Sequence, residues 1–229
     1  MQRPARRRFL RNHQTVTNLM EVWECDILDM QSLSKYNDTY RYSLSVIDVF
    51  SKYLHLVPIK TKSGPAVTSA FRYLLHDDSL RPLWVRTDKG KEFLNKHFQD
   101  ILRDESIQFQ VFRNPEVKCA VVERFQRTIR ARLFKYFTFS NTYRYIDVLP
   151  NFVKAYNETV HTTTGMAPSQ LTDADVLKLC AGWKPEDCGF ESRQPCFVSG
   201  STFVSAKRKG NLPRLPNTIS VPKYLGSLK

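Results

Sequence analysis

Apolar and polar residues alternate along several short stretches of the chain, whereas other stretches repeat apolar residues at helical spacing. In residues 40–50, Tyr40, Tyr42, Leu44 and Val46 fall on one side of an extended chain, a pattern that predicts a strand with one buried face. The same reasoning along the chain predicts strands at 20–30, 40–50, 52–59, 82–88 and 107–112. Helices are predicted at 63–78, 91–105, 120–136 and 143–159.

The order of these predicted elements indicates the class of fold. The first three strands are separated only by short polar links, which favours an antiparallel meander. Strands and helices then alternate before two final helices, so the chain reads βββαβαβαα. This order predicts an α/β domain in which helices cover a five-stranded mixed sheet.

Positive charge is concentrated at the two ends of the chain. The formal net charge is +13, of which residues 1–20 contribute +5, residues 21–180 contribute +3 and residues 181–229 contribute +5. Basic ends on a nearly balanced centre suggest arms that contact a polyanion, although solubilising tails without a partner would give the same pattern. We expect a flexible basic arm (1–20), a folded core (21–175) and a poorly ordered basic tail or degenerate C-terminal module (176–229).

Hydropathy and cysteine spacing argue against several other classes of protein. No apolar run approaches the length of a transmembrane helix, and the first residues lack the apolar segment of a secretion signal. The five cysteines are scattered and include no C-x-x-C pair. We therefore expect a reducing compartment, with neither a disulfide framework nor a dedicated zinc module.

Three acidic residues occupy positions where a carboxylate needs an explanation. Asp26 lies inside an otherwise apolar strand, Asp88 ends the fourth strand, and Glu123 stands at the start of a helix. An aspartate at the end of a strand often only forms a turn, so Asp88 alone is ambiguous. Burying three carboxylates together is costly unless cations neutralise them. Hard oxygen ligands of this kind suit Mg²⁺ or Mn²⁺, and a pair of such ions supports in-line displacement at phosphorus.

Read in order, five segments of the chain resemble the catalytic core of retroviral-type integrases, a DDE recombinase domain of the ribonuclease H-like fold. The segments are WECDILDM, VIDVFSKY, RTDKGKEF, NPEVKCAVVERFQRT and YNETVHTTTGMAPSQ, and 34 residues separate Asp88 from Glu123. The resemblance covers residues 23–171 and extends in particular to integrases of Maverick/Polinton transposons and to transposon-derived proteins. It implies an integrase or transposase that nicks DNA and transfers strands during DNA integration.

The same resemblance implies roles for residues and partners. Asp26, Asp88 and Glu123 would be the catalytic residues and would bind two Mg²⁺ (or Mn²⁺) ions. The partners would be transposon ends and a target duplex, with self-association, a nuclear location and no membrane contact. Two other functions stay open. One is a transposon-derived nucleic-acid-binding protein that has lost catalysis, and the other is ribonuclease H-type hydrolysis of RNA in hybrids, which the VERF and YNETVH segments do not support.

Five basic residues are candidate contacts to DNA. On the helix at 120–136, Glu123, Arg127 and Arg130 repeat along one exposed stripe, which by itself could be a Glu–Arg pair on a solvated face. Beside a metal site, the same arginines would hold DNA phosphates. The other candidates lie in the segments that follow Asp88 and precede Glu123, namely Lys89, Lys91 and Lys118.

Other features do not enter the predicted site. Asp29 is expected at the surface, Asp48 is expected to begin a turn, and Glu92 is expected to cap the helix at 91–105. The chain also departs from complete integrases at both ends. Only His13 precedes the core as a candidate for an upstream His₂Cys₂ zinc domain, and residues 181–229 do not read as a C-terminal DNA-binding barrel.

Overall fold

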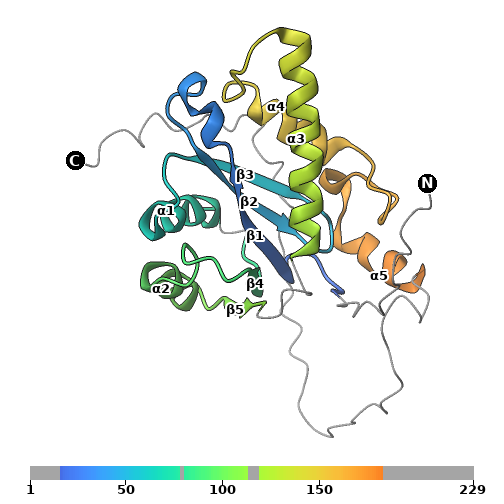
Figure 1. Ribbon diagram of the computed structural model, residues 1–229. Helices are drawn as coiled ribbons and strands as arrows, with labels where there is room; N and C mark the ends of the chain where they lie inside the picture. Colours follow the sequence, from blue (N-terminus) through green and yellow to red (C-terminus); the bar gives the residue numbers. More distant parts are fainter. Residues whose placement is uncertain (1–15, 78–79, 113–118, 183–229) are drawn as a thin grey trace, which may run out of the picture.

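The computed structural model describes residues 16–77, 80–112 and 119–182, and the strands of this part form one five-stranded sheet (Figure 1). The strands are β1 (Val22–Asp29), β2 (Tyr42–Asp48), β3 (Leu54–Ile59), β4 (Trp84–Thr87) and β5 (Gln108–Val111). Their order in the sheet is β3-β2-β1-β4-β5. The first three strands pair antiparallel, whereas β4 lies parallel to β1 and β5 lies parallel to β4. The predicted mixed sheet and its antiparallel meander are confirmed.

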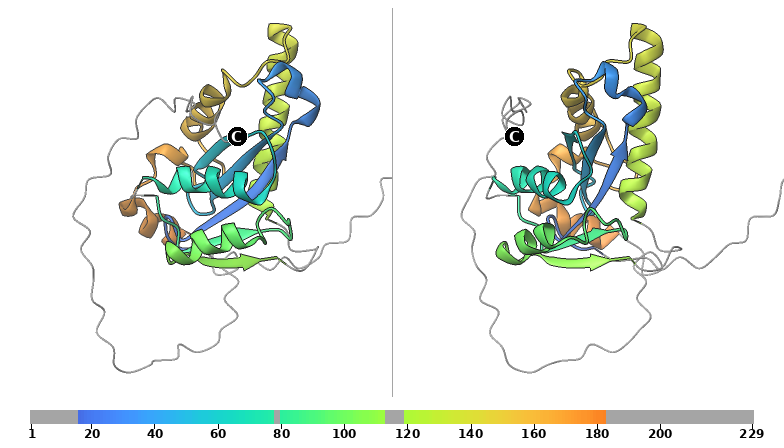
Figure 2. Two further views of the ribbon diagram at one scale, coloured as in Figure 1. Left: turned by 90° about the vertical axis from the view of Figure 1, so that its left-hand side faces the viewer. Right: turned by 60° about the vertical axis from the view of Figure 1, so that its left-hand side comes forward.

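Helices cover both faces of this sheet, as the predicted element order requires. They are α1 (Gly64–Leu75), α2 (Lys96–Asp104), α3 (Ala120–Ser140), α4 (Leu149–Glu158) and α5 (Asp173–Gly182), with 3-10 helices η1 (Gln31–Tyr36) and η2 (Pro168–Gln170). Helices α1 and α2 lie together on one face, and α3 and α4 lie on the other (Figures 1 and 2). Within the described residues, no helix combines the length and apolarity that crossing a bilayer would need.

The period-two pattern of the strands divides the core into two layers. Trp23 and Cys25 of β1 are buried in the cluster that includes α1 and α2. Leu28 of the same strand is buried in the cluster that includes α3 and α4. Because successive strand residues point to opposite faces, the even-numbered residues of β1 face α3. Asp26 is one of them, so its carboxylate lies on the face of the sheet that α3 covers.

A third, smaller apolar cluster joins segments that are far apart in the sequence. Its buried members are Val16, Val22, Phe50, Leu171 and Val176. The cluster therefore packs the residues before β1 and the helix α5 onto the same end of the sheet. The predicted limits of the core at 21 and 175 fall inside this packed region, because Val16 and Val176 both lie outside them and are buried. The rest of the arm and tail, residues 1–15 and 183–229, lies outside the described residues.

Three predicted helix boundaries were wrong. Helix α2 begins at Lys96 rather than at residue 91, and its N-cap is Asn95, whose side chain accepts a hydrogen bond from the Phe98 amide at 3.0 Å. Glu92 therefore does not cap this helix. Helix α3 extends four residues beyond 136, to Ser140, where Asn141 ends it in the left-handed conformation with a φ of 48°. Helix α4 begins only at Leu149, and α5 was not predicted.

Candidate active site

Asp26 lies in the middle of the sheet, on the face covered by α3. It is partly buried, and both of its carboxylate oxygens accept hydrogen bonds. Its own strand supplies the first, from the Ile27 amide to Oδ1 at 2.7 Å. Helix α3 supplies the second, from Gln126 Nε2 to Oδ2 at 3.0 Å. This second bond fixes α3 against β1 at the level of the aspartate.

Asp88 follows the last residue of β4 and is exposed at the carboxyl edge of the sheet. The parallel register pairs Glu24 with Arg86, so two residues further along each strand Asp26 and Asp88 come side by side. The Gly90 amide donates to Asp88 Oδ1 at 3.0 Å, so Asp88 also forms the turn that its sequence suggested. The turn reading and the site reading are therefore compatible.

Gly90 leaves room for a fourth acid. A Cβ added at this glycine would stand 2.7 Å from the carboxyl carbon of Glu92. The glycine therefore allows the Glu92 side chain to fold back over the turn after β4. Sequence reasoning assigned Glu92 to a helix cap, but its charge acts on Asp26 instead.

Glu123 lies in the first turn of α3, where its amide donates to the Cys119 carbonyl at 3.0 Å. Residues three apart on a helix are neighbours on its surface, so Glu123 lies one turn before Gln126 on the same flank. Because Gln126 contacts Asp26, Glu123 lies beside Asp26 as well. The middle of β1, the end of β4 and the start of α3 thus bring the three predicted carboxylates near enough for the charges of Asp88 and Glu123 to act on Asp26.

The pKa of Asp26 reflects the nearby acids. Burial is the main cause that raises the pKa of Asp26 from 3.8 to about 6, and the charges of Asp88, Glu123 and Glu92 raise it further. The hydrogen bond from Ile27 opposes them. Negative charges gathered around a buried carboxyl group favour the binding of a cation there. The arrangement is therefore suited to binding a positively charged species.

The three acids suit a divalent metal ion by the type of their ligand atoms, but not by the distances between their side chains. Carboxylate oxygens are the ligands that Mg²⁺ and Mn²⁺ prefer. Among the described residues, however, no group of three or more His, Cys, Asp or Glu side chains is close enough to hold a metal ion. The oxygens of Asp26 each accept one hydrogen bond, from Ile27 and from Gln126, and a carboxylate oxygen has a second lone pair that remains available to a cation. The catalytic and metal-binding roles of the three acids stay predictions.

Sequence reasoning missed Glu24, a buried carboxylate two residues before Asp26. Glu24 is 5% exposed and accepts hydrogen bonds from the amides of Val121 at 3.0 Å and Val122 at 3.1 Å. Burial raises the pKa of Glu24, while these two amides and the charges of Lys52 and Arg86 oppose the rise. The residue before α3, Cys119, makes no side-chain cap. Glu24 therefore caps, from β1, the helix that carries Glu123.

The predicted DNA-contacting residues divide into three groups. Lys89 and Lys91 are exposed in the turn that follows Asp88. Arg127 and Arg130 are exposed on α3. On the helix surface, the next turn places Phe134 between them. Lys118 lies outside the described residues. Two other structural assignments are confirmed: Asp29 is exposed, and Asp48 closes the turn after β2 by accepting a hydrogen bond from Ser51 Oγ at 2.5 Å.

The class of protein follows from this fold and from a match in sequence. Residues 17–114 match the model of the integrase core domain family, a range that contains Asp26 and Asp88 and ends before Glu123. With the sheet order and the helix layers, this match makes the described part of the chain similar to an integrase core domain.

Particular relatives agree with this class. A transposon-derived protein of Caenorhabditis elegans is 33% identical over 146 residues, which are 64% of this chain and 51% of the relative. The chain thus spans about half the length of that relative. The HTLV-2 integrase catalytic core domain, solved in complex with magnesium, has a TM-score of 0.54 at 20% identity, covering 66% of this chain and 94% of that chain.

A second solved structure extends the likeness in fold. A chain of the simian T-cell lymphotropic virus intasome, solved with the PP2A regulatory subunit B56 gamma, has a TM-score of 0.63 at 20% identity. The likeness covers 74% of this chain and 60% of that chain. At this level of identity the two solved structures show a shared ribonuclease H-like fold. The predicted fold class is therefore confirmed.

Proposed function

We propose that this core is a metal-dependent polynucleotidyl transferase that nicks DNA and joins DNA strands. The observation that carries the proposal is the contact between β1 and α3. Gln126 of α3 holds the Asp26 carboxylate at 3.0 Å, so Glu123 one turn earlier faces the strand edge where Asp88 lies. This convergence is what a phosphoryl-transfer site built from three carboxylates requires.

Each of the three acids has a defined task in this proposal. Asp26 and Asp88 would share divalent cations, and Glu123 would complete the second position of a two-ion site for Mg²⁺ or Mn²⁺. Bound ions of this kind stabilise the attacking and leaving oxygens of an in-line displacement. Because the pKa of Asp26 is about 6, its carboxylate is available as a ligand above that pH. Glu24 holds the start of α3 so that Glu123 keeps its place.

Exposed cations around the acids would hold the substrate. Lys89 and Lys91 follow Asp88, and Arg127 and Arg130 follow Glu123 on α3, so DNA phosphates bound there would bracket the site. We propose the same role for Lys118. The proposed substrates are transposon ends and a target duplex, joined by a homo-oligomer in the nucleus. The integrase family match, the transposon-derived relative and the likeness to an intasome chain support the DNA substrates and the oligomer, whereas the nuclear location is a proposal from the sequence alone.

Titration calorimetry with MgCl₂ or MnCl₂ tests the metal site directly. We expect saturable binding to the full chain above pH 6, lost in Asp88→Asn and retained in Asp29→Asn, a matched change at an exposed aspartate of β1. Incubation with a DNA-end oligonucleotide should then give metal-dependent nicked and strand-transfer products with the wild-type chain only. Equal binding and equal product yield in the Asp88 variant would overturn the assignment of the site.

A second function has its own observation. In the described residues the carboxylates do not come within metal-holding distance of one another, and each oxygen of Asp26 accepts a hydrogen bond from a protein group. A transposon-derived protein that binds nucleic acid without catalysis would keep the fold and the basic surface in this state. If the wild-type chain binds duplex DNA but neither binds Mg²⁺ nor yields products, this second function replaces the first.

A further inference from the structure

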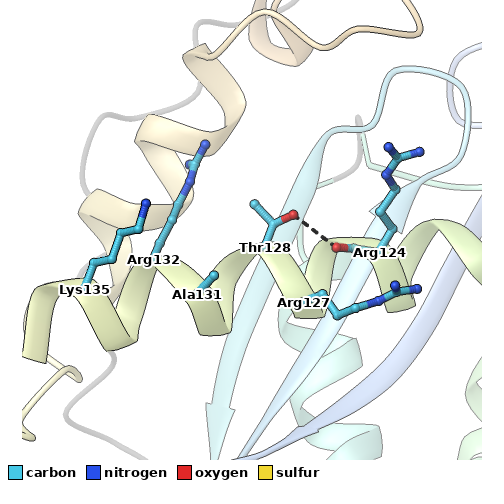
Figure 3. A pocket seen from close by; sticks show the side chains of 6 residues that line it. All are labelled: Arg124, Arg127, Thr128, Ala131, Arg132 and Lys135. Carbon is cyan, nitrogen blue, oxygen red and sulfur yellow. Dashed lines mark hydrogen bonds between the residues drawn. The ribbon is translucent and has the colours of Figure 1, made fainter. Parts of the chain in front are cut away.

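Helix α3 has a second basic surface, on the flank away from the carboxylates. A shallow hollow of about 440 Å³ follows this flank (Figure 3). It is lined by Arg124, Arg127, Thr128, Ala131, Arg132 and Lys135. Only Arg127 belongs to the basic residues singled out in the sequence. We call this surface the α3 hollow.

Most of the α3 hollow lies on a different side of the helix from the carboxylate site, and the two surfaces meet at Arg127, four residues after Glu123. Arg124, Thr128 and Arg132 are four residues apart and therefore form one row. The Arg132 guanidinium lies 5.9 Å from the ring centre of Tyr156 in α4, and the charge of Arg124 acts on Tyr156 and on His161 beyond α4. The row thus faces α4, whereas Gln126 on the other flank faces Asp26. A ligand in the hollow would not occupy the candidate active site.

The cations of the α3 hollow have no acidic partner within the described part of the chain. Among the described residues, Arg124, Arg127, Arg132 and Lys135 form no ion pair, and no acid lines the hollow. Other surface cations of the chain do pair: Arg144, for example, binds both Asp38 and Asp147. Four clustered positive charges without counter-charges repel one another, and binding of an anion relieves that repulsion.

The shape of the hollow favours a chain of anions over a single one. Lys135 stands eleven positions after Arg124, which is about 16 Å along a helix axis. A single phosphate or carboxylate could contact only part of this row, whereas successive phosphates of one nucleic-acid strand could contact all of it. Arginine is well suited to phosphate because its guanidinium donates two parallel hydrogen bonds.

We propose that the α3 hollow is a second binding tract for the phosphate backbone of duplex DNA. The inference rests on the proposed function, and it adds that α3 holds DNA on two flanks at once. One flank presents the acids with Arg130, and the other presents the α3 hollow. DNA bound in the hollow would hold the duplex without entering the carboxylate site.

The salt dependence of binding tests this tract without any catalytic readout. The variant Arg124→Gln/Arg132→Gln/Lys135→Gln removes three charges from the hollow and keeps residues that favour helices. The control Arg72→Gln/Lys96→Gln/Arg103→Gln removes three exposed charges from α1 and α2, on the opposite layer of the sheet. The affinity for a fluorescent duplex is measured for the two variants and for the full wild-type chain at salt concentrations from about 50 to about 200 mM. Over this range the loss of affinity depends on the number of phosphate contacts.

The slope of log K against log salt is negative, and each lost phosphate contact reduces its steepness by about 0.9. We therefore expect the slope of the hollow variant to be less steep than that of the wild type by about 2 to 3, and that of the control to change by less than about 1. Equal slopes in the two variants would overturn the hollow as a DNA tract. Circular dichroism of both variants verifies that the helices remain.

Further outcomes separate this inference from the proposed function. A wild-type chain that binds duplex DNA with Mg²⁺-dependent products, but with equal slopes in both variants, refutes the hollow alone. A wild-type chain that does not bind duplex at 50 mM salt, about the lower end of the tested range, refutes both. If the hollow variant loses binding to polyglutamate while its DNA slope stays unchanged, an acidic polypeptide is the occupant and the DNA assignment is wrong.

Discussion

The protonation of Asp26 reports whether the three distant acids lie together. The charges of Asp88 and Glu123 contribute to raising the pKa of Asp26 to about 6. Removing one of these charges must therefore lower it. We expect the pKa of Asp26 in the metal-free Asp88→Asn variant to lie below its wild-type value, as measured by NMR titration of the ¹³C-labelled carboxyl group.

The matched control for that titration is Asp29→Asn. Asp29 belongs to the same strand but is exposed, and it is not among the groups that shift Asp26. Its substitution should leave the pKa of Asp26 unchanged. If the Asp88 and Asp29 variants give the same Asp26 titration, Asp88 does not lie near Asp26 and the candidate site is not assembled as described.

His55 makes the stability of the fold depend on pH. It is 7% exposed in β3 and lies 5.5 Å from Trp23, ring centre to ring centre. Burial lowers the pKa of His55 from 6.5 to about 4. Between these values the unfolded chain binds a proton that the folded chain does not, so the free energy of unfolding falls as pH drops from 6.5 towards 4. A shift of this size corresponds to about 3 kcal/mol at the acid end.

The test compares urea unfolding of the wild type and of His55→Phe at about pH 7 and about pH 4.5. The first value lies above the pKa of an unfolded histidine, and the second lies close to the pKa of His55 in the folded state. We expect the wild type to lose more stability on acidification than the variant, because phenylalanine cannot take up the proton in the unfolded state. Asp26 acts with the opposite sign, since its raised pKa lets the folded state bind a proton below about 6. Only the difference between the two proteins isolates His55, and an equal loss in both would contradict the prediction.

Sequence reasoning found the three acids because their types and spacing form a pattern, but it could not find Glu24. A glutamate in a strand with alternating apolar residues is normally a solvent-facing residue. Its partners are the amides of Val121 and Val122, 97 and 98 residues away, and amides carry no signal in a sequence. The four clustered cations of the α3 hollow were visible as letters, but only the fold shows that they share one flank without an acid.

At the scale of elements, the first turn of α3 depends on β1. The Glu24 carboxylate satisfies two amides that a helix leaves without partners at its start. We expect Glu24→Leu to lower the free energy of unfolding by about 2 kcal/mol and to speed hydrogen exchange at Val121 and Val122. Glu24→Gln, which keeps an acceptor oxygen, should retain most of the protection. Equal exchange in both variants would mean that Glu24 does not cap α3.

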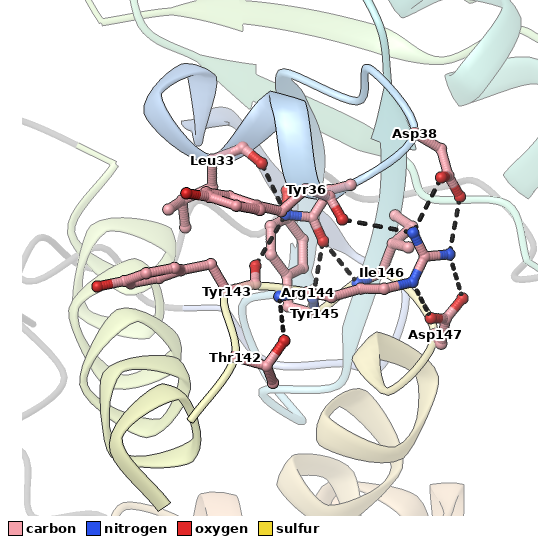
Figure 4. A network of polar contacts seen from close by, with 10 residues as sticks. Leu33, Tyr36, Asp38, Thr142, Tyr143, Arg144, Tyr145, Ile146 and Asp147 are labelled. Carbon is pink, nitrogen blue, oxygen red and sulfur yellow. Dashed lines mark hydrogen bonds and ion pairs between the residues drawn. The ribbon is translucent and has the colours of Figure 1, made fainter. Parts of the chain in front are cut away.

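Element boundaries were less predictable than element types, and α4 shows why. Its sequence pattern begins near residue 143, yet the helix starts at Leu149. The intervening residues are held by the segment after β1 (Figure 4). Asn37 Oδ1 accepts hydrogen bonds from the amides of Tyr145 at 2.7 Å and Ile146 at 3.1 Å. These amides are thereby bound to a distant loop, a competition that periodicity cannot reveal.

Arg144 strengthens the same connection. Its guanidinium donates to Asp38 at 2.9 and 3.0 Å and also pairs with Asp147 (Figure 4). The hydrogen bonds from Arg144, together with its charge, hold the pKa of Asp38 below its usual value. The pairs are exposed, so each one contributes little stability alone. Their arrangement nevertheless fixes the path of the chain between α3 and α4, and a helix through these residues would break it.

At the scale of the whole molecule, the sheet and its layers followed from the order of the elements, whereas the extent of the domain did not. Short polar links predicted the antiparallel pairing of the first three strands. The strands β4 and β5 each follow a helix, and both pair in parallel. The end of the core is set by packing between residues near both limits of the described chain. Val16 and Val176 meet in one cluster, although 159 residues lie between them in the sequence.

Neighbouring residues of α5 allow this extent to be tested. Val176 is 6% exposed in the cluster with Val16 and Phe50, whereas Leu177 is 77% exposed. If α5 belongs to the folded core, Val176→Ala should lower the free energy of unfolding by about 1 to 2 kcal/mol, since it leaves a cavity that the better helix propensity of alanine only partly offsets. Leu177→Ala should change it by less than about 0.5 kcal/mol. Chemical denaturation of the full chain measures both, and equal effects would place α5 outside the cooperative unit that carries the three acids.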